Sequence, residues 1–115
     1  MSDYKVEGNI LIVNGQRVSF QYKIDNVKLC MGLYIVLLDI PMGVSFLNNI
    51  YAVDDNGNIV WQVQDPREVY PINGHIEYVG TRITDDDKIV ATNFSGISYT
   101  VDPSNGKIID KGFTK

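Results

Sequence analysis

The sequence predicts an all-β protein: a single antiparallel β-sandwich or barrel-like domain of about eight or nine strands, with at most one short helical turn. Three observations predict this class. Short apolar runs recur along the 115 residues, and turn signals rich in Asn, Asp and Gly separate them. Helical periodicity is nearly absent. No linker or low-complexity segment divides the chain, so we expect residues 1–115 to form one domain.

The first predicted hairpin joins an apolar run at residues 10–13 to the most regular strand of the chain. Asn14-Gly15 between them readily takes the positive φ angles of a type I′ turn. The return strand alternates apolar with polar residues: Val18, Phe20, Tyr22 and Ile24 against Arg17, Ser19, Gln21 and Lys23. Such alternation is typical of a half-buried antiparallel strand.

The middle of the chain holds its most apolar strand. A turn or bulge is predicted at Asp25-Asn26, and a bend or bulge at Gly32. Between them one face carries Val27, Leu29 and Met31, and the other carries Lys28 and Cys30. Residues 33–38 show no polar alternation, which predicts a strand covered on both faces.

A hairpin and a helical turn follow the apolar loop at residues 41–48. The hairpin is predicted over residues 49–64, with its turn at 55–58. The sequence Asp65-Pro66-Arg67-Glu68 combines a capping residue, a proline suited to the first helical position and a capping-box glutamate. Asn73-Gly74 ends this segment after about one turn. The remaining strands are expected at 76–83, 88–94, 97–101 and 107–110.

The same patterns predict which side chains form the core, because a slip of one residue would reverse the faces of each strand. The residues expected to be mostly buried are Phe20, Tyr22, Ile35, Leu37, Val53, Trp61, Val90 and Val101. The residues expected to be exposed are Arg17, Lys23, Asp55, Asp86 and Lys107.

Two hairpins share a pattern. One reads Ile50-Tyr51-Ala52-Val53-Asp54, then Gly57 and Ile59-Val60-Trp61; the other reads Ser98-Tyr99-Thr100-Val101-Asp102, then Gly106 and Ile108-Ile109. The pattern resembles the blade hairpins of quinoprotein-type β-propellers. A propeller needs about four blades of roughly 40 residues each, so this chain has material for fewer than three. No quinone or metal ligand carries over from the resemblance.

The whole chain is also similar to a group of small, uncharacterised bacterial all-β proteins. The segments that carry this similarity are Asn49-Ile50-Tyr51-Ala52-Val53-Asp54 and Gly57-Asn58-Ile59-Val60-Trp61-Gln62. The similarity implies a compact family domain and implies no activity.

The charge balance disfavours nucleic acid as a partner. Ten Lys and Arg residues face fourteen Asp and Glu, for a net charge of −4, whereas nucleic-acid binding rests on a basic footprint. No apolar run approaches the roughly 18 residues of a membrane helix. The amino-terminal residues lack the basic and apolar regions of a signal peptide, and a single cysteine forms no internal disulfide. We therefore expect a cytoplasmic protein without a membrane partner.

Motifs for catalysis, cofactors or metals are not recognisable, so no residue is assigned to such a role. The chain has one histidine, His75, and one cysteine, Cys30, which is read as an apolar filler of a strand. If Gly57 took the sixth position of a calcium loop, Ala52 would stand at the first position, where a carboxylate is required. Asp and Asn in these loops are therefore read as turn formers. A pair of catalytic carboxylates that are distant in the sequence and brought together by the fold is an alternative that the sequence leaves open.

The loop Met42–Leu47 is the candidate interface. Its apolar side chains have little polar relief, and they are Met42, Val44, Phe46 and Leu47. Exposed apolar patches usually mark contact surfaces, and a homodimer is the commonest closed assembly. The alternative is that the loop folds over one end of the core.

Three functions follow from these expectations, in order of preference. The first is a non-catalytic module that binds another protein, such as an acidic inhibitor or immunity-type protein that masks a basic surface. The second is a β-barrel that binds a small molecule in an interior cavity above about 300 Å³. The third is an enzyme that relies on carboxylates or tyrosines alone.

Overall fold

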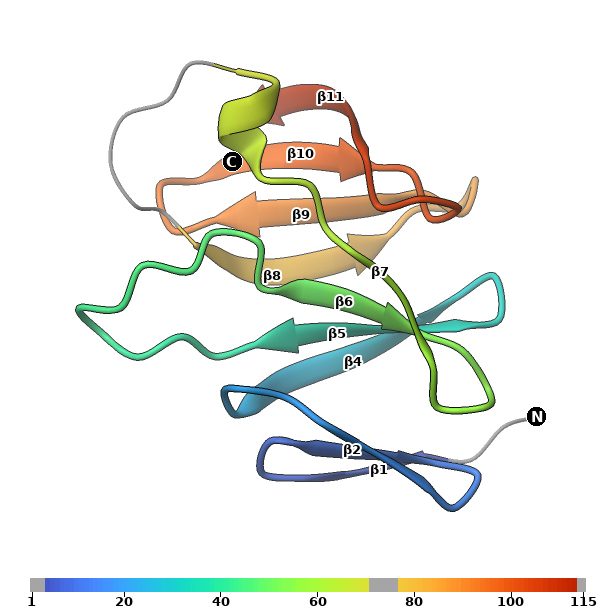
Figure 1. Ribbon diagram of the computed structural model, residues 1–115. Helices are drawn as coiled ribbons and strands as arrows, with labels where there is room; N and C mark the ends of the chain where they lie inside the picture. The colour runs from blue at the N-terminus through green and yellow to red at the C-terminus, as the bar shows by residue number, and fades with distance from the viewer. Residues whose placement is uncertain (1–3, 71–76, 114–115) are drawn as a thin grey trace.

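Three antiparallel sheets are stacked in the computed structural model, which describes residues 4–70 and 77–113 (Figure 1). The first sheet contains β1 (Tyr4–Glu7), β2 (Ile10–Val13) and β3 (Gln16–Ser19). The second contains β4 (Ile24–Cys30), β5 (Leu33–Leu38), β6 (Ile50–Val53) and β7 (Ile59–Gln62). The third contains β8 (Tyr78–Ile83), β9 (Ile89–Asn93), β10 (Ile97–Val101) and β11 (Ile108–Phe113).

The all-β class is confirmed, but the predicted sandwich or barrel of eight or nine strands is wrong. The described residues form eleven strands in three sheets, and within each sheet the strands pair in the order of the sequence. The physical reason is that period-two alternation marks the buried face of a strand but does not tell how many layers of sheet the chain forms.

The second sheet is the middle layer, and β5 is buried on both faces as the sequence predicts. Ile35 and Leu37 join the core cluster between the second and third sheets. Tyr34, Val36 and Leu38 join the cluster between the first and second sheets. These two clusters are the apolar interiors of the fold, and β5 belongs to both.

The chain crosses from the first sheet to the second at residues 20–23, inside the strand that the sequence predicts over residues 17–24. The burial alternation holds, since Phe20 and Ile24 are buried, but β3 ends at Ser19 and β4 begins at Ile24. The backbone N–H of Phe20 still donates to the Asn9 carbonyl, at 2.8 Å, while Asp39 N–H donates to the Lys23 carbonyl of the next layer, at 2.7 Å. The chain therefore passes from one sheet to the next without any break in the alternation of apolar and polar residues.

Strand β4 has a bulge between Ile24 and Asn26, where a turn or bulge is predicted. Cys30 is buried in the core cluster shared with the third sheet, whereas Leu29 and Met31 are exposed. The reason is that β4 is an edge strand of its sheet and lies beside β8, so its Cys30 face is covered better than the other. Met31 and Gly32 form the β4–β5 turn, with φ of +50° and +78°.

The local turn predictions are confirmed. Asn14 and Gly15 take φ of +48° and +83°, as a type I′ turn requires. The helical turn is a 3₁₀ helix, η1 (Pro66–Glu68), capped by the Asp65 side chain, which accepts from the Arg67 N–H. Predictions for Asn73-Gly74, His75 and Ile76 fall outside the described residues.

Most predicted core residues are buried. Phe20, Ile35, Leu37, Val53, Trp61 and Val101 are buried, and all five residues predicted to be exposed are exposed. Tyr22 and Val90 are less completely buried than the other six, but neither is exposed, and Tyr22 packs against the core between the first two sheets. Val90 lies on the third sheet, which has a neighbouring layer on one face only, and Tyr22 lies in the crossing between sheets.

Candidate functional site

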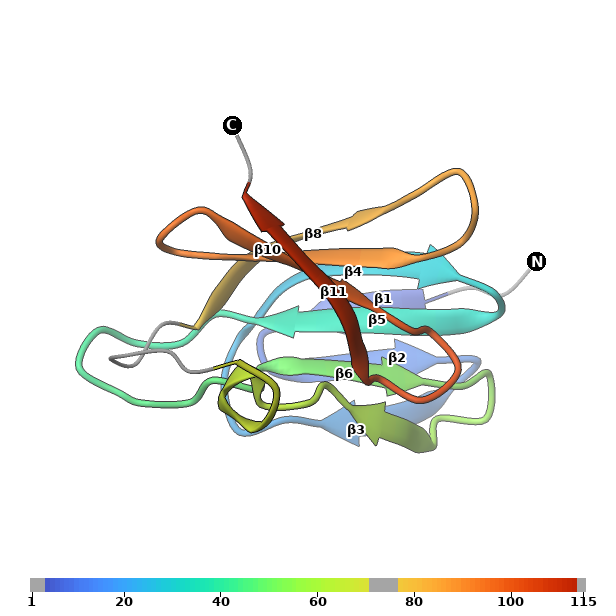
Figure 2. The same cartoon turned by 90° about the horizontal axis from the view of Figure 1, so that it is seen from above.

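The loop between β5 and β6 projects beyond the strand ends at one side of the stack (left in Figure 2). Its base is fixed by Asn49, which is fully buried. The Asn49 side-chain NH₂ donates to the carbonyls of Leu38 and Tyr78, both at 2.9 Å, and its Oδ1 accepts from the Tyr78 N–H at 3.1 Å. One amide thus ties the loop to β8 of the third sheet, and the sequence gives no signal for it.

The four predicted interface residues divide between two roles. Met42 is fully exposed, Val44 and Phe46 are half-buried, and Leu47 retains 3% exposure. The Phe46 ring packs on the Tyr22 ring with centroids 5.6 Å apart. Thus Phe46, in the part of the loop that leads into β6, covers the core between the first two sheets. Met42, in the part that follows β5, is presented to the solvent.

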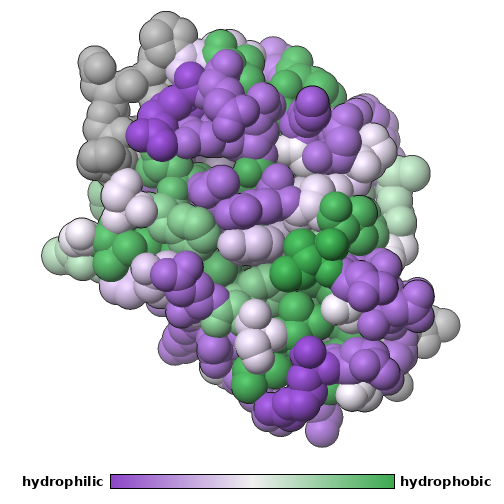
Figure 3. Space-filling view, viewed as in Figure 1, coloured by the Kyte–Doolittle hydropathy of each residue, from purple (hydrophilic) through white to green (hydrophobic). Residues whose placement is uncertain are grey.

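A surface groove of about 560 Å³ runs beside the part of the loop that follows β5. Residues 39–45 form one wall, including Met42 and Val44, and Val79 and Phe94 contribute to the other. Phe94 is 79% exposed and Val79 is 47% exposed. Hydrophobic side chains gather on this side of the molecule in the space-filling view (left in Figure 3). We call this the loop groove.

The β9–β10 turn explains why Phe94 stands out into solvent. The Asn93 side chain, itself buried, accepts from the N–H groups of Ser95 and Ile97, both at 3.0 Å, so it is engaged inside the turn. The Phe94 N–H donates to the Glu77 carbonyl at 3.2 Å. An aromatic residue in a turn otherwise made of Asn, Ser and Gly is the one sequence signal that points to this wall of the groove.

Two carboxylates lie in the loop groove. Asp39 is exposed and Glu77 is half-buried. Both also line a smaller cavity of about 150 Å³ next to it, which includes Asp25. Within residues 4–70 and 77–113, no hydrogen bond or ion pair engages the side chains of Asp39 or Glu77. The same residues contain no group of three His, Cys, Asp or Glu side chains placed to hold a metal ion.

Cys30 lies away from the groove and is a core residue. Its Sγ lies 3.6 Å from the Asp87 carbonyl oxygen, and burial, followed by the Asp87 charge, raises the pKa of the thiol. A raised pKa leaves little thiolate at neutral pH. The reading of Cys30 as an apolar filler is consistent with this environment.

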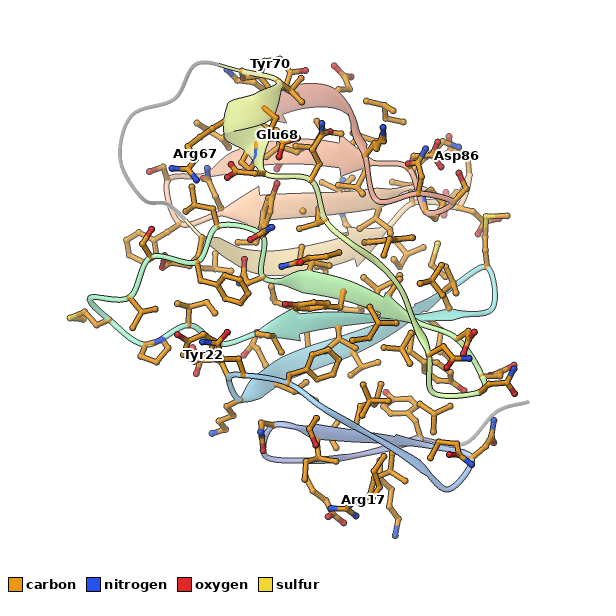
Figure 4. The ribbon with its side chains drawn as sticks, in the orientation of Figure 1. Arg17, Tyr22, Arg67, Glu68, Tyr70 and Asp86 are labelled. Atoms are coloured by element: carbon orange, nitrogen blue, oxygen red, sulfur yellow. The ribbon has the colours of Figure 1, made fainter. Side chains whose placement is uncertain are left out.

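A second, polar depression of about 300 Å³ lies near η1 and includes Gln62, Gln64 and Asp65. Its side chains already serve the fold. Gln64 Oε1 accepts from the Ile108 N–H at 3.0 Å, Gln62 donates to the Asn48 carbonyl at 2.9 Å, and Asp65 pairs with Arg67 at 2.6 Å. Figure 4 shows Arg67 and Glu68 on η1, away from Tyr22. The loop groove therefore offers the freer binding groups.

Comparison of the chain with known protein families identifies a family but no activity. The model of the family described as "Domain of unknown function (DUF7957)" matches residues 1–113. A search of curated proteins gives no match. Within the described residues, no helix has the length and apolar character needed to cross a membrane.

Proposed function

We propose that this chain, which belongs to the DUF7957 family over residues 1–113, is a non-catalytic module that binds another protein through the loop groove. The observation that carries the proposal is the exposure of Met42 and Phe94, which line the same groove from distant segments of the chain. Met and aromatic side chains are enriched where proteins meet, and an apolar anchor in a groove is the usual centre of binding energy.

The construction of the groove supports this role. Its lining comes from the β5–β6 loop, from β8 and from the β9–β10 turn, and Asn49 bonds the loop to β8. A rigid support lowers the entropy that binding would otherwise cost. An acidic inhibitor or immunity-type protein, which masks a basic surface on its partner, is the kind of module that fits a net charge of −4.

A small molecule is the second candidate occupant. The groove volume of about 560 Å³ lies in the range of small-molecule sites, and its lining is largely apolar with two carboxylates. The barrel predicted for this function is absent from the described residues, whose sheets pack face to face. The site would therefore be a surface groove and not an interior cavity.

We also propose that the second and third sheets are related to the blades of quinoprotein-type β-propellers. In its support, the second and third sheets are both four-stranded meanders, stacked in sequence order. Their matched hairpins also carry a bulge at the same place, between Ala52 and Val53 and between Thr100 and Val101. The cytoplasmic location and the exclusion of nucleic-acid and membrane partners stay predictions.

The test compares partners retained by three forms of the protein. Tagged wild type, the double variant Met42→Ser/Phe94→Ser and the control Met31→Ser are each used to isolate complexes from the source cell. Met31 is 68% exposed and lies in the turn before β5, at the opposite end of that strand from the loop. We expect one protein to be retained by wild type and by the control, and to be lost from the double variant.

Three results would reject the proposal. Retention of the same proteins by all three forms would place binding outside the groove. A small molecule found by native mass spectrometry on wild type and absent from the double variant, without any protein, would favour the second candidate. A dimer of the chain that Met42→Ser/Phe94→Ser abolishes would instead support the homodimer.

A further inference from the structure

We infer that the loop groove recognises a protein segment in which a Lys or Arg stands next to an apolar side chain. This inference rests on the proposed function and adds the chemistry of the partner. Its basis is the placement of two carboxylates, Asp39 and Glu77, beside exposed apolar side chains in one groove, with no hydrogen bond or ion pair to either side chain from the part of the chain that the structure describes.

The apolar side of the groove sets the first requirement. Phe94, Val79 and Met42 together present large apolar side chains that are nearly half exposed or more. Burying apolar area is favourable at about 25 cal/mol per Å², and Met adapts its shape to what it contacts. An occupant therefore needs at least one apolar side chain to cover these residues.

The carboxylates set the second requirement. The Asp39 N–H donates to the Lys23 carbonyl, which holds the backbone of this residue against the crossing between sheets, and Asp39 itself is exposed and lines the groove. A bound apolar segment would partly desolvate Asp39 and Glu77, and a buried charge is costly unless it is paired. A Lys or Arg in the segment offsets part of this cost by pairing with the carboxylates. An Arg or Lys could also lie over the exposed Phe94 ring, where a cation–π contact adds to the attraction.

The same charges argue against a second copy of this chain as the occupant. A twofold interface places one patch against itself, so the carboxylates of each copy would approach those of the other. Like charges opposed across an interface are unfavourable. The net charge of −4 adds repulsion between copies. A cationic partner meets neither obstacle.

The experiment uses four fluorescein-labelled decapeptides and measures binding to the full chain by fluorescence polarisation. Each peptide has a four-residue centre flanked by Gly and Ser. The centres are Lys-Leu-Phe-Lys, Gln-Leu-Phe-Gln, Glu-Leu-Phe-Glu and Lys-Ser-Ser-Lys. We expect the first to bind about three- to tenfold more tightly than the second, since exposed ion pairs contribute modestly. The acidic peptide and the peptide without apolar residues should bind more weakly still.

Two variants of equal net charge locate the effect. In Asp39→Asn/Glu77→Gln the advantage of the lysine peptide over the glutamine peptide should disappear. In the control Asp85→Asn/Asp87→Asn, which alters exposed residues of the β8–β9 turn, the advantage should persist. Figure 4 shows the neighbouring Asp86 at the side of the molecule opposite the loop. Asn is suited to the positive φ of Asp87, which is +60°.

The outcomes separate this inference from the proposed function. Equal binding of the lysine and glutamine peptides, an advantage that survives in Asp39→Asn/Glu77→Gln, or no binding of any peptide overturns the charge requirement. If a protein partner is still retained through Met42 and Phe94, the proposed function stands without it. If the partner is also retained by Met42→Ser/Phe94→Ser, the groove itself is rejected.

Discussion

The β6–β7 and β10–β11 hairpins use the same turn chemistry but rest on different supports. Asp54 Oδ1 accepts from the N–H groups of Asn56 and Asn58 at 2.9 Å, and Asp102 Oδ1 accepts from the Ser104 N–H at 2.9 Å. Gly57 and Gly106 take φ of +80° and +76°. Local sequence thus dictates both turns, because Asp closes the turn and Gly alone takes the required φ without strain.

The supports differ because each turn packs on the last strand of the preceding sheet. A β-carbon at Gly57 would lie 2.7 Å from Cβ of Gln16, an exposed residue of β3. A β-carbon at Gly106 would lie 2.5 Å from Cε3 of Trp61, a buried residue of β7. The Trp61 indole N–H donates to the Pro103 carbonyl at 2.8 Å. The second turn is therefore locked to a fixed ring, and the first turn rests on an exposed edge strand.

The largest expected effect is that of adding a methyl group at these two glycines. Gly106→Ala should lower the free energy of unfolding by about 3 kcal/mol, through the strain of a positive φ and the overlap with the Trp61 ring. Gly57→Ala should cost about 2 kcal/mol, because the exposed strand bearing Gln16 can yield more easily. Urea denaturation of both variants measures the difference. Equal losses would mean that the turn geometry alone matters and that its support does not.

A smaller effect is expected from changing the supports themselves. Trp61→Phe should cost about 2 kcal/mol, because it removes the indole donor and leaves the Pro103 carbonyl without that partner inside the protein. Gln16→Ala should cost less than about 0.5 kcal/mol, as exposed positions usually do. Thermal or urea unfolding of the two variants decides the comparison. A Gln16→Ala loss as large as that of Trp61→Phe would contradict the assignment of the rigid support to the second hairpin.

The same contrast between local and distant causes explains what the sequence could predict. Asn14-Gly15, the 55–58 turn and the capped turn at Asp65 are local, and all three lie where expected. The doubly covered strand at residues 33–38 was also predictable, since a strand buried on both faces cannot alternate. The number of layers was not predictable, because the chain changes sheet at residues 20–23 without changing its alternation.

The candidate site was predictable only on one wall. The apolar loop indicated Met42 and Val44, which line the groove. It also indicated Phe46, which packs against the core between the first two sheets, and Leu47, which is buried. The opposite wall and its charge come from residues far along the chain: Val79, Phe94 and Glu77. Their meeting depends on the pairing of β8 with β9 and on the bonds of Asn49 to β8, and no local pattern reports such contacts.

The smallest expected effect concerns the stability of the protein at low pH, and it tests the turn chemistry that the two hairpins share. Hydrogen bonds from the backbone of Asn58 and Asn56 lower the pKa of Asp54, and bonds from the backbone and hydroxyl of Ser104 lower the pKa of Asp102. A group whose pKa is lowered by folding stabilises the protein above its unfolded pKa, which is near 3.8 here. That stabilisation is lost as the pH falls through the lower, folded pKa.

We therefore expect the urea midpoint of the wild type to be level from pH 7 to about pH 5 and to fall below about pH 4. Asp54→Asn and Asp102→Asn should each make that fall shallower, because a neutral amide accepts the same turn hydrogen bonds without titrating. Asp85→Asn, at an exposed position of the β8–β9 turn, is the matched control. If the two turn variants flatten the dependence of the urea midpoint on pH equally, the carboxylates of the two turns stabilise the protein to the same extent, and the hairpins differ only in their supports. If only one does so, the hairpins differ in their turns as well, and the repeat would be one of shape without shared chemistry.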